Sequence, residues 1–254
     1  MADRMIELGE GFWNVRGSFK FAGMVDIGTQ TSLVRLKSGQ FVLLDAYEPD
    51  EAVMRQIMAL TDEGRAIEAI INLHPFHTIH VEAMANHLPH AKLYGTARHV
   101  ARAPGLTWQP ELVESEAFPP LYADDLVFSL PAGVELIPEN EHLHFASILA
   151  YHPASKTLHV DDTLSWVDAP LIGGLAFHFT LKKVLYKRPG AAAAFRAWAE
   201  ELITLCEDVE HLCTAHSRPL PPSPSSGGPA IATMVRQAYA KQDKMLAAHE
   251  RKFG

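Results

Sequence analysis

The sequence contains few of the features that mark secreted, membrane or disulfide-rich proteins. Its two cysteines, Cys206 and Cys213, are seven positions apart, which fits neither a zinc ribbon nor a disulfide framework. No apolar run approaches the roughly 18 residues that cross a bilayer, and residues 1–5 show no signal-peptide pattern. We therefore expect a cytoplasmic protein with buried thiols and no membrane partner.

Positive charge is also scarce. The 254 residues include 22 Lys and Arg against 30 Asp and Glu, a formal net charge of −8. Because a phosphate backbone must be neutralised by Lys and Arg, this balance argues against a nucleic-acid partner. With 48% hydrophobic and 20% charged residues, the chain has the composition of a globular protein with a substantial core.

The first half alternates strand and helix patterns. Residues 12–46 are rich in β-branched and aromatic residues divided by glycines, which predicts a β-meander. Helical spacing over 49–64 and 81–88 then alternates with apolar strands at 66–73 and 91–96. This order predicts a partly parallel sheet covered by helices.

The second half repeats the arrangement after a proline-rich loop at 102–125. Strands are expected at 127–133, 134–139, 142–153, 156–164 and 209–217, and a loop at 171–180. Helices are expected at 190–208 and 230–252, and the last one covers its own sheet or packs on a neighbouring chain. No linker divides the halves, so we expect a single domain, 1–254, made of two αβ halves.

Imidazoles and carboxylates gather where predicted strands end. They are His74 and His77, His142 and His144, Asp161 and Asp162, and His216. Binding crevices open at strand ends of such sheets, so these side chains can converge there. Together they suit zinc, iron or manganese, and such a metal lowers the pKa of a bound water. His159 shares a strand face with Asp161, which indicates a hydrogen-bonded pair.

The order and context of these motifs resemble the metallo-β-lactamase superfamily over roughly residues 10 to 220. Its His-x-His-x-Asp-His motif, which follows a buried strand, matches "NLHPFH" at residues 72–77. "HVDDTL" resembles its "GDTL" context, with Asp162 as the bridging acid and Asp161 where Gly is usual, and "TAHS" supplies a last ligand, His216. The resemblance implies an α/β fold, an αββα sandwich of two mixed β-sheets flanked by helices, and metal-dependent hydrolysis.

This chain departs from the family pattern at two ligand positions. Asn72 replaces the first His of the motif and Phe76 replaces its Asp, while either His142 or His144 supplies the middle His. The remaining ligand set then suits one divalent metal ion, zinc or alternatively iron or manganese, or none. It consists of His74, His77, Asp162, His216 and one of His142 and His144.

Two functions follow from this depleted site. One is hydrolysis of an ester, lactone or amide-type bond of a small-molecule substrate, with Asp162 as the catalytic residue that orients water. The other is a catalytically inactive protein that binds a small molecule or a protein partner without metal. In either case the resemblance places Asn72, Phe76, Trp166 and His178 around the substrate pocket. A single-metal redox site is a weaker third alternative, since nothing in the sequence marks a flavin-binding region.

Overall fold

The computed structural model describes residues 2–21, 25–167, 173–216 and 219–254, and its larger sheet is built by the first half of the chain. The order of its strands is β1-β2-β5-β6-β7-β8. Strands up to β6 pair antiparallel, whereas β6, β7 and β8 run parallel. The bounds are β1 Arg4–Glu7, β2 Phe12–Gly17, β5 Thr29–Arg35, β6 Phe41–Leu44, β7 Ile67–Ile71 and β8 Lys92–Tyr94.

The second half builds a four-stranded sheet in the order β14-β11-β10-β9. Here β10 pairs antiparallel with β9 and β11, and β11 runs parallel to β14. The bounds are β9 Val127–Ser129, β10 Leu149–His152, β11 Thr157–Val160 and β14 His211–Thr214. Two hairpins accompany the sheets, β3 Lys20–Phe21 with β4 Val25–Asp26, and β12 Leu164–Val167 with β13 Gly174–Phe177.

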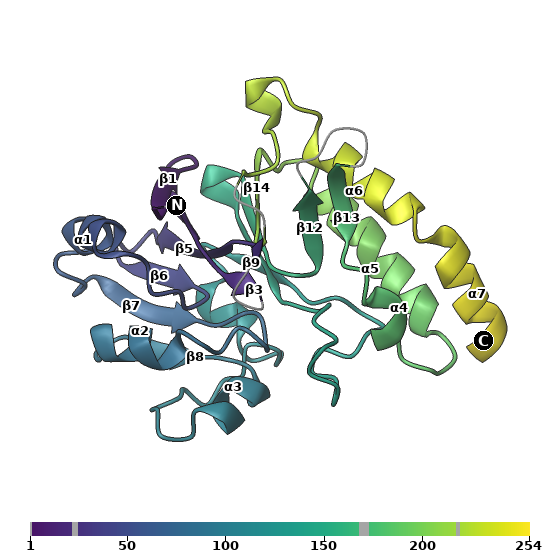
Figure 1. The fold of residues 1–254 in the computed structure, drawn as a ribbon, viewed down its shortest axis with the longest axis horizontal. Helices are drawn as coiled ribbons and strands as arrows, with labels where there is room; N and C mark the ends of the chain where they lie inside the picture. The colour runs from purple at the N-terminus through teal and green to yellow at the C-terminus, as the bar shows by residue number, and fades with distance from the viewer. Residues whose placement is uncertain (1, 22–24, 168–172, 217–218) are drawn as a thin grey trace.

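Helices lie on the outer sides of the two sheets (Figure 1). In the first half they are α1 Glu51–Leu60, α2 Val81–His87 and α3 Ala97–Arg102. In the second half they are α4 Leu181–Val184, α5 Ala191–Leu205, α6 Ile231–Ala240 and α7 Asp243–Phe253. Three short 3₁₀ turns span Pro119–Tyr122, Pro153–Ser155 and Pro224–Ser226.

Alternation along the central strands divides the core into three layers. In β6, Phe41 and Leu43 pack toward α1 and α2, whereas Val42 and Leu44 pack between the sheets. In β10, Leu149 packs toward α5 while Ala150 meets the same inner layer as Val42. Successive strand residues point to opposite faces, so each sheet is covered on both sides. The expected αββα sandwich is confirmed.

Several expected elements differ from those observed. Residues 134–139 form no strand, because only Val134 makes a bridge, to Leu185, and Pro138 offers no N–H. The expected loop at 171–180 contains β13, which pairs with β12, and the part at 171–172 lies outside the described residues. The helix expected at 230–252 is two helices, since Gln242 N–H turns back to Tyr239 O and Asp243 starts α7. Strand β1 and helix α3 were not expected.

Within the described ranges, no helix is both long and apolar enough to cross a membrane. Cys206, at the end of α5, and Cys213, in β14, are free and buried, as the sequence predicts.

Burial raises the pKa of both cysteine thiols to about 12. The thiolate is the reactive form, so we expect neither thiol to react with Ellman's reagent near neutral pH until the protein is unfolded. Titration with and without guanidinium measures this, with two thiols released only on unfolding. Rapid reaction of one or both thiols in the folded protein would contradict the burial.

Candidate metal centre

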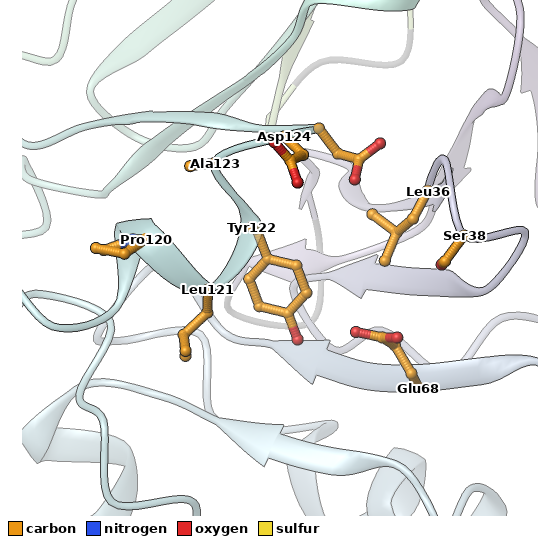
Figure 2. A pocket seen from close by; sticks show the side chains of 9 residues that line it. Leu36, Ser38, Glu68, Pro120, Leu121, Tyr122, Ala123 and Asp124 are labelled. Atoms are coloured by element: carbon orange, nitrogen blue, oxygen red, sulfur yellow. The ribbon is translucent and has the colours of Figure 1, made fainter.

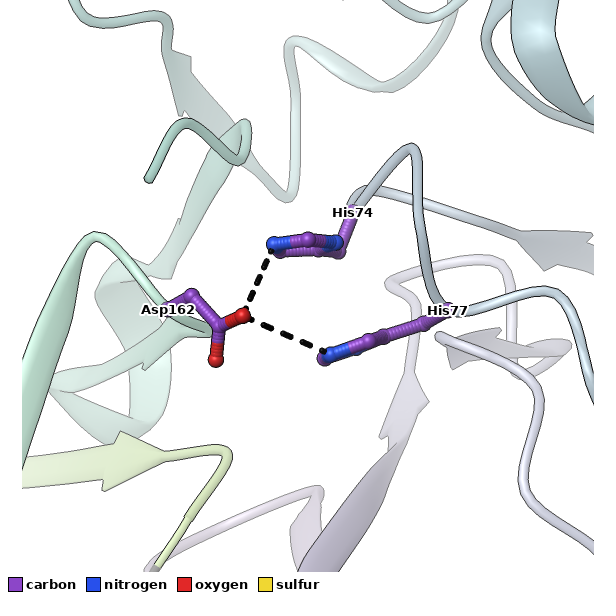
Figure 3. Close-up of side chains that lie close together, drawn as sticks. All are labelled: His74, His77 and Asp162. Carbon is purple, nitrogen blue, oxygen red and sulfur yellow. Dashed lines mark ion pairs between the residues drawn. The ribbon is translucent and has the colours of Figure 1, made fainter. Parts of the chain in front are cut away.

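The loop after β7 carries His74 and His77 to Asp162 (Figure 3). Asp45 at the end of β6 anchors this loop, because its Oδ1 accepts hydrogen bonds from the N–H groups of Leu73 at 2.8 Å and His74 at 3.2 Å. Asp45 has a φ of 59°, in the left-handed region that Asp tolerates better than most residues. Since β6 and β7 are parallel neighbours, their ends meet at one edge of the sheet. The first sheet therefore fixes where the two imidazoles lie.

Asp162, which follows β11, lies at the centre of an outer cluster that also contains His74, His77, His144 and His216. Its Oδ1 is 3.0 Å from His216 Nε2, and its Oδ2 is 3.3 Å from His74 Nε2. The same Oδ2 is 3.9 Å from His77 Nε2 and from His144 Nδ1. Asp162 is only 3% exposed. Three segments, distant in the sequence, thus place four imidazoles around one buried carboxylate.

His144, rather than His142, is the second-half imidazole that faces this cluster. His142 is exposed and its backbone N–H donates to the Asn140 side chain at 3.0 Å. His144 is half-buried and lies 3.9 Å from the Asp162 carboxylate. His144 therefore takes the place of the middle His, and we no longer propose His142 as a metal ligand.

Phe76 packs against the outer cluster without offering it a donor atom. Its ring stacks on His144, with centroids 4.9 Å apart and planes inclined by 4°. The Arg98 guanidinium lies 4.5 Å from the Phe76 ring centroid and pairs with Glu141 at 2.9 Å. An aromatic ring held by a cation and an imidazole thus stands where the family motif has a carboxylate.

Asn72 does not line a pocket, contrary to expectation. It is fully buried, and its Oδ1 accepts from Ala46 N–H at 3.3 Å while its Nδ2 donates to Tyr94 O at 2.9 Å. These bonds tie the segment after β6 to β8, so the amide serves the backbone and not a ligand.

Trp166 and His178 belong to the β12–β13 hairpin region beside the cluster. Trp166 packs against the core under α5 and α6, so its role in a pocket remains a prediction. His178 Nδ1 forms a 2.8 Å hydrogen bond with Thr180 Oγ1. Burial lowers the pKa of His178, and the nearby charge of Asp162 opposes that shift. The His178 N–H donates to Thr163 O at 3.4 Å, and Thr163 directly follows Asp162 in the sequence.

Charges in the outer cluster are strongly coupled. Burial alone would raise the pKa of Asp162, but His216 and His74 hold it well below its ordinary value. Burial acts to lower the pKa of His216, yet Asp162 and the carbonyl of Gly28 raise it. Burial and the neighbouring His74 lower the pKa of His77 well below its usual range. Near neutral pH Asp162 is therefore a carboxylate and His77 is neutral, whereas the shift of His216 favours its protonated form.

Behind the outer cluster lies a second group of buried polar side chains, the inner cluster of Asp45, His159 and Asp161. His159 Nε2 is 3.1 Å from Asp45 Oδ2 and 3.8 Å from Asp161 Oδ1. Sequence reasoning paired His159 with Asp161 but missed Asp45. The available signal was its place at the end of a buried strand, immediately before the segment that leads to the parallel strand β7.

The outer cluster has the donor set and spacing of a site for one divalent cation. Donor atoms of His74, His77 and Asp162 all lie within 4.8 Å of one another. Ligands at about 2.0–2.2 Å from one zinc ion stand roughly 3–4 Å apart. His74 Nε2 and Asp162 Oδ1 are buried without a well-aligned hydrogen bond from any described residue. His216 Nδ1 bonds the Gly28 carbonyl at 2.9 Å, a support that metal-binding imidazoles commonly have.

Solved structures resemble this chain over nearly its whole length. The metallo-β-lactamase TMB-1 matches with a TM-score of 0.65 and 10% identity, covering 96% of this chain and 98% of that one. FIM-1 from Pseudomonas aeruginosa, solved in a mono-zinc form, matches with a TM-score of 0.59 and 14% identity over 95% and 96%. A metallo-β-lactamase from Erythrobacter litoralis matches with a TM-score of 0.59 and 18% identity over 94% and 96%.

The chain has the metallo-β-lactamase fold. No protein-family model and no curated protein matches its sequence. The likeness in structure therefore establishes the fold, and the chemistry must be argued from the cluster itself.

A cavity of about 260 Å³ is lined by other residues (Figure 2). They are Leu36 and Ser38 between β5 and β6, Glu68 in β7, and residues 120–125 in and after the first 3₁₀ turn. Tyr122 lies between the Leu121 and Glu68 side chains there. Burial, and then the neighbouring Tyr94, raise the pKa of Tyr122, which keeps the phenol neutral. This cavity contains none of the clustered histidines and does not extend the candidate centre.

We expect the stability contributed by His216 to depend on pH. Because its folded-state pKa is raised, protonated His216 stabilises the fold fully below the unfolded histidine pKa of about 6.5, and this is lost as the pH rises through the folded-state value. In chelator, His216→Ala should cost on the order of 1–3 kcal/mol at about pH 5.5, and less at about pH 8.5.

Urea unfolding of the wild type, His216→Ala and the exposed-residue control His142→Ala at both pH values measures this difference. The His142→Ala control should have nearly the same free energy of unfolding as the wild type at both pH values. An equal cost of His216→Ala at both pH values would show that Asp162 does not hold the extra proton on His216.

Proposed function

We propose that this protein is a metal-dependent hydrolase whose outer cluster binds one divalent cation, zinc or alternatively iron or manganese. The substrate we propose is a small molecule with an ester, lactone or amide-type bond. The observation that carries the proposal is the convergence of imidazoles from distant segments on the buried Asp162, with distances of 3.0 to 3.9 Å.

His74, His77, Asp162 and His216 would hold the cation, and His144 lies within reach of the same carboxylate. A bound divalent cation lowers the pKa of a coordinated water and polarises a carbonyl oxygen. The lowered pKa of Asp162 keeps it a carboxylate near neutral pH, so it can orient a water by accepting its proton in a hydrogen bond.

His178 is the side chain best suited to give a proton to a leaving group. Thr180 holds the ring through Nδ1, so proton exchange takes place at Nε2. Burial keeps the pKa of His178 below its usual value, so the neutral ring predominates near neutral pH and Nε2 must take up a proton before it can give one to a leaving group.

The segments that carry the site also carry exposed apolar side chains, which supports a substrate with an apolar part. Phe179, next to His178, is 83% exposed, and Ile79, two residues after His77, is 69% exposed. Large apolar side chains this exposed beside a polar cluster are typical of a ligand-contacting surface.

A metal-free binding protein is the second candidate, and the loop at 74–76 favours it. Phe76 N–H donates to His74 Nδ1 at 3.1 Å, which places the proton of a neutral His74 on Nε2 toward Asp162. Phe76 also fills a family ligand position with a stacked ring. In this alternative the protein binds a small molecule or a protein partner through the same surface.

We expect purified protein to retain about one equivalent of metal that His74→Ala and Asp162→Ala lose, because each removes a donor from the outer cluster. Elemental analysis measures the content, and thermal unfolding with Zn, Mn or Fe against chelator measures the stabilisation. At a hundredfold excess over Kd the stabilisation is about 2.7 kcal/mol.

His142→Ala is the matched control, since it removes an exposed imidazole two positions from His144. Equal metal content in wild type and both cluster variants, with no effect of chelator, would reject the hydrolase. Stabilisation by an organic ligand under those conditions would establish the binding protein.

Hydrolytic activity itself is expected toward apolar lactones or aryl esters. It should fall by about 10²-fold or more in Asp162→Asn, since the amide cannot accept the proton of the water as the carboxylate does. A screen of such substrates by product release measures this, with the zinc-loaded protein and His142→Ala as references. Activity that is unchanged in Asp162→Asn would exclude the role given to this carboxylate.

A further inference from the structure

The inner cluster lies at the junction of both sheets. Asp45 ends β6 of the first sheet, whereas His159 and Asp161 belong to the end of β11 in the second. All three are at most 2% exposed. Three carboxylates, those of Asp45, Asp161 and Asp162, are thus buried close together, an arrangement that requires compensating charge.

Donor atoms in the inner cluster have the spacing of ligands around a single ion. His159 Nε2 lies 3.1 Å from Asp45 Oδ2 and 3.8 Å from Asp161 Oδ1, and His77 Nδ1 lies 3.8 Å from the same Asp161 oxygen. Donor atoms of Asp45, His77 and Asp161 all lie within 4.8 Å of one another. Two carboxylates and two imidazoles form a donor set that suits zinc, manganese or iron.

A shell of polar side chains orients these donors. His159 Nδ1 hydrogen-bonds Ser32 Oγ at 2.9 Å, and Nε2 hydrogen-bonds Asp45 Oδ2 at 3.1 Å. With the ring proton held on Nδ1, a cation can replace the hydrogen bond between Nε2 and Asp45. The Gln30 Oε1 accepts from Arg16 at 2.8 Å and from Asn14 at 3.1 Å, which turns its Nε2 toward Asp161 Oδ1 at 3.3 Å. His159 and Asp161 are thereby held in defined orientations.

Within the inner cluster, one buried carboxylate oxygen has no well-aligned donor. Asp161 Oδ2 is buried and has no hydrogen-bond partner among the residues that the structure describes, although Asp161 is only 1% exposed. A buried carboxylate oxygen without a partner is costly unless a ligand completes its environment. This residue also stands where the resembling family usually has glycine, so the carboxylate is a feature of this chain.

We propose that Asp45, Asp161, His159 and Nδ1 of His77 form a second, inner divalent-cation site, distinct from the outer cluster. A cation there cross-links the loop after β7 to the end of β11 and so ties the two halves together. His77 offers Nδ1 to this site and Nε2 to the outer cluster, where Nε2 lies 3.9 Å from Asp162 Oδ2. When both sites are filled, His77 bridges the two cations as an imidazolate, and its ring proton is released to solvent. The inner site rests on its own geometry and does not require that the outer cluster catalyse hydrolysis.

Asp161→Asn is the variant that tests the inner site. Asn keeps the size of the side chain and an oxygen that can accept the Gln30 Nε2 hydrogen bond, which measures 3.3 Å at Asp161 Oδ1. It is, however, a poor metal ligand. In chelator this variant should unfold at the temperature of the wild type.

Chelator-treated protein is dialysed against buffered Zn²⁺, and bound zinc is measured by elemental analysis. The wild type should bind one equivalent more than Asp161→Asn, and the double variant His74→Ala/His216→Ala should retain the inner equivalent. Equal zinc in wild type and Asp161→Asn would overturn the inner site. Loss of zinc in the double variant alone would then leave the outer cluster as the metal centre, so the two proposals fail separately.

His159→Gln provides a second measurement if Asp161→Asn unfolds. It removes the fourth inner donor while Asp161 stays in place, and inner zinc affinity should fall by roughly tenfold or more. Unchanged affinity in a folded His159→Gln would overturn the site as proposed.

Discussion

The interaction on which this molecule's candidate centre depends is the contact of Asp162 with His216 and His74. A carboxylate this deeply buried is stable only beside compensating charge or a cation, because desolvation strongly disfavours its ionised form. His216 follows the last strand of the second sheet, and His74 follows a parallel strand of the first. The contact therefore exists only when both sheets are stacked, so the fold and the site form together.

Asn72 and Phe76, which replace two ligands of the family motif, have different structural roles. The Asn72 amide links two backbone segments, because it accepts a hydrogen bond from Ala46 N–H and donates one to Tyr94 O. Phe76 became part of an aromatic stack under Arg98, which removes a donor but keeps the loop packed. Asp161 adds a carboxylate on the inner side instead. Donor groups in this chain are thus shifted toward the interior relative to the family motif.

The sequence predicted most strands of the sandwich because strands buried on both faces are continuous apolar runs, as Phe41 to Leu44 illustrate. Motif order likewise predicted that His77, Asp162 and His216 converge. Asp45 was missed because an Asp after a strand is commonly only a turn residue, and its parallel neighbour is visible only in three dimensions. His144 was not separable from His142, since the sequence predicted one strand over 142–153, whereas the observed strand β10 starts only at Leu149 and the segment before it is irregular.

Anomalous diffraction at the zinc edge, from crystals grown with zinc, tests the central claim most directly. The account predicts a peak bonded to an oxygen of Asp162 and to ring nitrogens of His216 and at least one of His74 and His77. A crystal without a peak there, in which Asp162 bonds His216 and His74 directly despite excess zinc, would contradict it.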